Sequence, residues 1–116
     1  ALKGFMASYE KCDKAITDLS ASGGDDRQNK AGDAAADLSA KAFLRLSSLI
    51  KNDSELMDQA LAVADLARRE LDSRRFSRSE IKKKDAGLAK LAEEARVLTG
   101  KRQAAYARFQ ELAGAH

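Results

Sequence analysis

The chain has 116 residues, with 44% hydrophobic, 34% charged and only 5% aromatic residues, no proline and a formal net charge of +3. This length gives one domain, 1–116, with room for a core that needs neither metal nor disulfide. The single cysteine, Cys12, excludes an internal disulfide, and no apolar run approaches the roughly 20 residues of a membrane span.

Apolar residues at alternating spacings of three and four predict a first helix at about 1–21. The stripe is made by Leu2, Phe5, Tyr9, Cys12, Ile16 and Leu19. This spacing puts side chains on one face of an α-helix and on neither face of a strand. Because Cys12 lies within the stripe, we expect a buried and inert thiol. Gly23 and Gly24 then end the helix.

Two further helices are predicted at about 26–51 and 54–72. Asp25 and Gln28 resemble a capping pair for the second helix, whose first turns are rich in alanine. Asn52 and Glu55 cap the third, which is apolar nearly all round from Leu56 onward. A helix of that kind is typical of a central position in a bundle.

The fourth helix is predicted at about 78–113, starting at a capping box formed by Ser77 and Glu80. The alternative is one unbroken helix over 53–113, because no glycine or proline separates the halves. The fold class is therefore all-α, an antiparallel four-helix bundle with a long C-terminal helix. At 1.5 Å per residue that helix spans roughly 54 Å, so it either overhangs its neighbours or bends.

Charge is distributed unevenly along the chain. Residues 1–67 carry eight Lys/Arg and eleven Asp/Glu, whereas residues 68–116 carry thirteen and seven. The basic stretch 68–84 contains Arg68, Arg69, Arg74, Arg75, Arg78, Lys82, Lys83 and Lys84. It indicates either a site for nucleic acid or an anionic membrane, or only a solvated turn between helices.

The last apolar stripe has ten core-type heptad positions from Ile81 to Leu112, and only Lys84 and Arg102 among them are charged. The stripe indicates either the bundle core or, where the helix overhangs, a surface for a partner helix or a second copy. The residues expected to pair are Arg102, Ala105, Phe109 and Leu112. Arg102 would then need a carboxylate partner or a solvated seam.

No catalytic constellation is apparent in the sequence. The only histidine is His116, so zinc and haem ligands are too few, and no phosphate-binding glycine loop occurs. We therefore expect no enzyme activity, no cofactor, no metal and no small-molecule substrate. The predicted function is a protein interaction module: an adaptor, a secretion or assembly chaperone, or a subunit of a larger complex. The alternative is an anion-binding module that uses residues 68–84.

The sequence does not indicate the cellular compartment of the protein. Without a membrane span we expect a soluble protein, and the start at Ala1 fits a processed or trimmed N-terminus.

Overall fold

The structure is a computed structural model that describes residues 2–21, 25–42, 54–74 and 85–114. These residues form four α-helices: α1 (Leu2–Ala21), α2 (Asp25–Ala40), α3 (Ser54–Arg74) and α5 (Asp85–Gly114). A π-helical turn at residues 41–42 follows α2. The predicted all-α bundle is thus confirmed, and no strand occurs in the described ranges.

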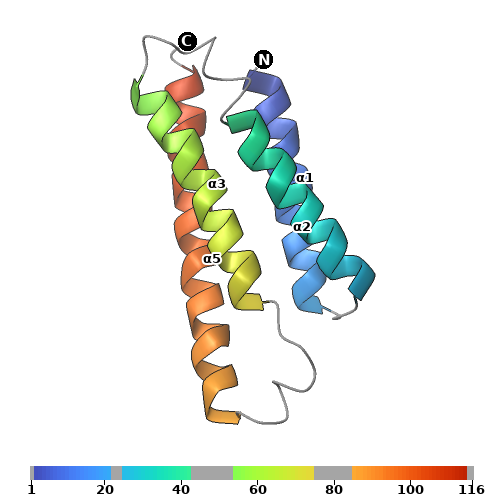
Figure 1. The fold of residues 1–116 in the computed structure, drawn as a ribbon. Coiled ribbons are helices and arrows are strands. Elements are labelled where there is room, and N and C mark those ends of the chain that lie inside the picture. Colours follow the sequence, from blue (N-terminus) through green and yellow to red (C-terminus); the bar gives the residue numbers. More distant parts are fainter. Residues whose placement is uncertain (1, 22–24, 43–53, 75–84, 115–116) are drawn as a thin grey trace.

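The helices run alternately up and down, so that each is antiparallel to the next along the chain (Figure 1). α3 and α5 pack together most extensively, followed by α1 with α2 and then α2 with α3. Since α3 contacts all three other helices, it has the central position that its apolar sequence predicted. The separate, antiparallel α3 and α5 show that the alternative of one unbroken helix over 53–113 is wrong.

The predicted boundaries agree closely at most helix ends. The first three helices begin within one residue of prediction, and Glu55 and Arg74 complement the dipole of α3 at its two ends. Residues 43–51 of the predicted second helix and 78–84 of the predicted fourth lie outside the described residues. So does the Ser77–Glu80 capping box.

The core is built from the stripes of all four helices. On α1 the buried hydrophobic residues are Phe5, Tyr9, Cys12, Ile16 and Leu19, as the spacing predicted. α2 and the turn after it contribute mainly small side chains, Ala31, Ala34, Ala35 and Ala42, with Leu38. Small residues let helix backbones approach closely, which explains how α2 fits against both α1 and α3.

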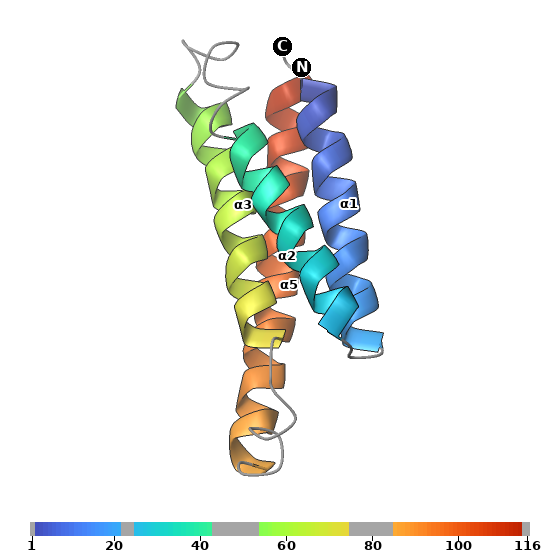
Figure 2. The ribbon, with the colours of Figure 1, turned by 45° about the vertical axis from the view of Figure 1, so that its right-hand side comes forward.

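At 30 residues, α5 is the longest helix, about 45 Å by its rise per residue. Both ribbon views show its N-terminal end extending past the ends of the other three helices (Figures 1 and 2). The predicted overhang therefore exists. It lies at the start of α5, whereas the sequence placed it beyond Gly100.

Candidate functional site

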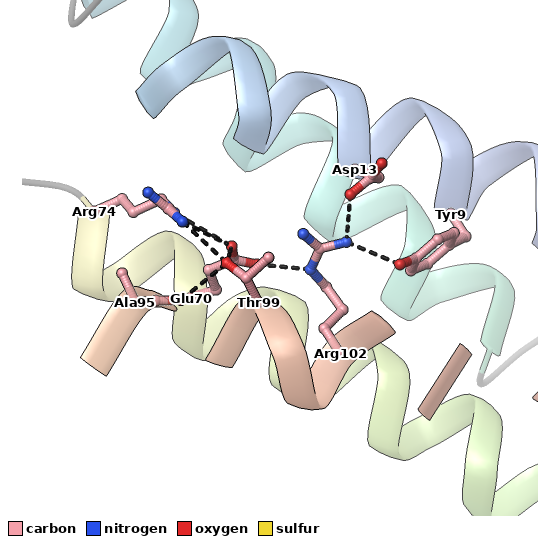
Figure 3. Close-up of polar contacts among 7 residues, drawn as sticks. All are labelled: Tyr9, Asp13, Glu70, Arg74, Ala95, Thr99 and Arg102. Carbon is pink, nitrogen blue, oxygen red and sulfur yellow. Dashed lines mark hydrogen bonds and ion pairs between the residues drawn. The ribbon is translucent and has the colours of Figure 1, made fainter. Parts of the chain in front are cut away.

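A buried polar network joins three helices at the guanidinium of Arg102 (Figure 3). Arg102 Nε donates to Oε2 of Glu70 at 2.6 Å. Its Nη1 donates to Oδ1 of Asp13 at 2.7 Å and to the Tyr9 hydroxyl at 2.9 Å. The side chains of Arg102 and Glu70 are each only 1% exposed, whereas Asp13 is 39% exposed. Asp13 is therefore the residue through which the network contacts solvent.

The second oxygen of Glu70 is also occupied. Arg74 donates to Oε1 from Nη2 at 3.2 Å and from Nε at 3.3 Å, and the Thr99 hydroxyl donates to the same oxygen. Thr99 Oγ1 also lies 2.9 Å from Arg74 Nη2 and from the Ala95 carbonyl oxygen. Glu70 is thus a buried carboxylate with both oxygens paired, the condition under which a charge is tolerated in a core.

Burial and neighbouring charges shift the pKa of Arg102 in opposite directions. Burial alone lowers its pKa, but the hydrogen bonds to Glu70 and Asp13 outweigh it and hold the pKa above the usual guanidinium value. Burial raises the pKa of Tyr9, although the charge of Arg102 opposes that shift. The network therefore keeps Arg102 charged and Tyr9 neutral at physiological pH.

The spacing of buried residues explains why these side chains meet. On α3, Leu56, Ala60, Val63 and Ala67 are fully buried, and Glu70 continues their three-four spacing. On α5, Arg102 occupies a core-type position between the buried Ala95 and Phe109. Of the two alternatives for Arg102, a carboxylate partner or a solvated seam, the structure shows carboxylate partners, Glu70 and Asp13, neither of which was assigned to it from the sequence. Glu70 could have been predicted as a buried residue, because it continues the three-four spacing of the apolar residues on α3.

An aromatic seam lies beside the network, between α1 and α5. The rings of Phe5 and Phe109 are 4.6 Å apart at 48°, and those of Tyr9 and Tyr106 are stacked 3.6 Å apart at 11°. Burial raises the pKa of Tyr106, while the nearby Gln110 side chain acts in the opposite direction. The buried Tyr106 hydroxyl has no hydrogen-bond partner of ordinary geometry among the described residues.

Cys12 is fully buried, which confirms the prediction from its position in the first stripe. Burial raises the pKa of its thiol to about 11, and the charge of Arg102 opposes this shift. Because the thiolate is the reactive form of cysteine, this environment suits an inert thiol and not a nucleophile.

The predicted basic stretch is only partly present among the described residues. Arg68 and Arg69 are exposed on α3, and Arg69 pairs with Asp65 of its own helix at 3.0 Å. Arg74 instead turns inward to the buried Glu70 carboxylate, with 23% of its side chain exposed, so its place in an anion-binding patch stays a prediction. The other five residues, Arg75, Arg78, Lys82, Lys83 and Lys84, lie outside the described residues.

The residues expected to pair with a partner helix lie within the core of this chain. Arg102, Ala105 and Phe109 are buried, and Leu112 is half-buried against the same core. The overhang was assigned to the wrong end of the helix because the spacing within α5 does not reveal its register against its neighbours, and its C-terminal half lies beside α1 and α3. Of the two interpretations of the stripe, the bundle core is therefore the correct one for these four residues.

Within the described ranges, no group of three or more His, Cys, Asp or Glu side chains could hold a metal ion. None of the described helices is long and apolar enough to cross a membrane. Comparison of the chain with protein-family models, curated proteins and solved structures finds no match. The geometry of this molecule is therefore the basis for any functional proposal.

Proposed function

We propose that this chain is a non-enzymatic helical module that binds another protein, as an adaptor, a secretion or assembly chaperone, or a subunit of a larger complex. The supporting observation is the N-terminal end of α5, which extends past the other three helices (Figures 1 and 2). A helix that extends past its neighbours can offer its protruding turns to a partner helix.

The exposed face of α5 that follows this end suits such a contact. Val97 is 47% exposed and is the one exposed large hydrophobic residue among the side chains that the structure describes. It lines an open groove of about 320 Å³ together with Glu93, Glu94, Leu98 and Lys101. An apolar centre flanked by charges of both signs is the pattern by which helices select partners in coiled coils. The apolar repeat also continues in the sequence through Leu88 and Leu91.

The self-associating form of this function is tested by sedimentation equilibrium of the native protein and the Val97→Asp variant. If the partner is a second copy, the mass of the native protein rises with concentration and the substitution lowers that association. A native protein that remains monomeric up to millimolar concentration rules this form out and leaves a different protein as the partner.

Binding to a different protein is tested by affinity capture with native chain, Val97→Asp and a matched control, Asp65→Asn on the exposed face of α3. We expect one partner that the native chain and Asp65→Asn retain and Val97→Asp loses. Equal capture by all three proteins contradicts a binding surface at Val97.

An anion-binding module is the second candidate, and the exposure of Arg68 and Arg69 on α3 favours it. Its test is salt-dependent binding of duplex DNA, single-stranded RNA and vesicles of anionic lipid. The double variant Arg68→Glu/Arg69→Glu should abolish binding. Arg74 should be left intact in this test, because reversing its charge would place a second carboxylate against buried Glu70. Absence of salt-dependent binding by the native protein rules this function out.

A further inference from the structure

The bundle is made of two helical hairpins. α3 packs most extensively on α5, followed by α1 on α2, and the contacts of α3 with α2 and with α1 are each less extensive. Polar side chains also bond within each hairpin: Ser8 donates to Asp37 at 2.8 Å between α1 and α2, and Gln59 donates to the Ala105 carbonyl at 3.2 Å between α3 and α5. The two helices of each hairpin are therefore held together by contacts that do not involve the other hairpin.

Charge is balanced only when the hairpins are together. In the α3–α5 hairpin, the network holds two guanidiniums, of Arg74 and Arg102, against one carboxylate, of Glu70, a net charge of +1. The carboxylate that neutralises this charge, Asp13, belongs to the α1–α2 hairpin. Arg102 bonds to Tyr9 of that hairpin as well. A charged hydrogen bond contributes more than a neutral one, so these contacts favour the closed arrangement.

We infer that Asp13 and Arg102 form an electrostatic latch that holds the α1–α2 hairpin against the α3–α5 hairpin. Asp13 is its release point, because its side chain is 39% exposed while Glu70 and Arg102 are 1% exposed. Loss of the Asp13 charge leaves the Glu70 pair intact within α3–α5, so the hairpins separate before either one unfolds. Separation exposes the aromatic seam of Phe5, Tyr9, Tyr106 and Phe109. The inference does not depend on the proposed function.

The chain contains a natural reporter of this opening. Cys12 is the only cysteine, is fully buried on α1, and lies close enough to Arg102 and Glu70 to feel their charges. A thiol reagent can reach it when α1 moves away from its neighbours, as it does when the hairpins separate, or when the whole bundle unfolds. The rate of Cys12 labelling in the native protein therefore measures the population of open molecules.

The experiment compares labelling of native protein and Asp13→Asn at pH 8, over a series of low urea concentrations. Asparagine keeps the shape and an acceptor oxygen but removes the charge. We expect labelling of Asp13→Asn to be about tenfold faster, after correction for the labelling rate of each unfolded chain. Because hairpin separation exposes less surface than unfolding, labelling should rise less steeply with urea than global unfolding does.

Two matched variants separate the latch from general loss of stability. Asp65→Asn removes an exposed ion pair on α3 and should leave the labelling rate unchanged. Ser8→Ala removes the bond within α1–α2 and should lower the urea midpoint while the labelling rate in native conditions changes less than in Asp13→Asn. The inference is overturned if Asp13→Asn labels at the native rate, or if its urea dependence equals that of global unfolding.

Discussion

Arg102 on α5 and Glu70 on α3 form a buried ion pair, with 2.6 Å between Nε and Oε2. Two buried charges are expensive to desolvate, so this pair is tolerated because further bonds from Arg74, Thr99, Asp13 and Tyr9 satisfy both partners. Removing Arg102 leaves Glu70 buried with one charged partner, Arg74, in place of two, whereas replacing both residues by apolar ones avoids the cost.

The first prediction compares the removal of one residue of the buried ion pair with the replacement of both. Arg102→Met should lower the free energy of unfolding by about 3–5 kcal/mol, because Glu70 then remains buried with only Arg74 as a charged partner. The double variant Arg102→Met/Glu70→Leu should recover much of that loss. Urea unfolding followed by circular dichroism measures both. A double variant less stable than Arg102→Met would show that the charged network is a net source of stability.

The second prediction compares the two stacked tyrosines. Tyr9→Phe removes a hydrogen bond to a charged guanidinium and should cost about 1.5–3 kcal/mol. Tyr106→Phe removes a buried hydroxyl that has no hydrogen-bond partner of ordinary geometry among the described residues, so it should be neutral or stabilising by about 1 kcal/mol. Both variants keep the ring stack. Thermal unfolding gives the comparison, and equal losses in the two variants would contradict the geometry of the seam.

The third prediction concerns alkaline pH. The folded protein raises the pKa of Cys12 from 9.0 to about 11, so it binds the thiol proton more tightly than the unfolded chain does. This contribution is fully present below pH 9 and is lost as the pH rises toward 11, about 3 kcal/mol in total. In Cys12→Ala the loss of stability between pH 9 and 10 should be smaller. An identical pH dependence in both proteins would contradict burial of the thiol.

Gly100 supplies the fourth prediction. It is exposed in the interior of α5, and a Cβ added there meets nothing within 4 Å. Since glycine costs about 1 kcal/mol relative to alanine inside a helix, Gly100→Ala should raise the stability by about that amount. Gly114→Ala, at the last residue of α5, is the control with a smaller expected gain. A lower melting temperature for Gly100→Ala would indicate that α5 must bend at this residue.

The sequence predicted the helices well because apolar spacing reports directly which face is buried. The stripe from Phe5 to Leu19 is buried throughout, and the separation of α3 from α5 was inferred from capping residues. The register between helices was not predicted, because spacing within one helix does not indicate which turn of a neighbouring helix lies opposite. For that reason the overhang of α5 was placed at Phe109 instead of at the start of the helix.

The candidate site was harder to predict than the fold. Charged residues are usually solvated, so Arg74 was assigned to the basic stretch and Glu70 was not considered as a core residue. The register of α3 against α5 brings Glu70 to Arg102 and makes both of them core residues. The heptad position of Arg102 indicated a carboxylate partner or a solvated seam, but the choice between them depends on that register.

Photo-crosslinking tests the proposed interaction most directly. A benzophenone amino acid is placed at Val97, on the exposed face of α5, and in a matched protein at Asp65 on α3, and both are illuminated in the organism that makes the protein. We predict one discrete crosslinked species from position 97 and none from position 65. The same products from both positions, or none from position 97, would contradict a partner-binding surface on α5.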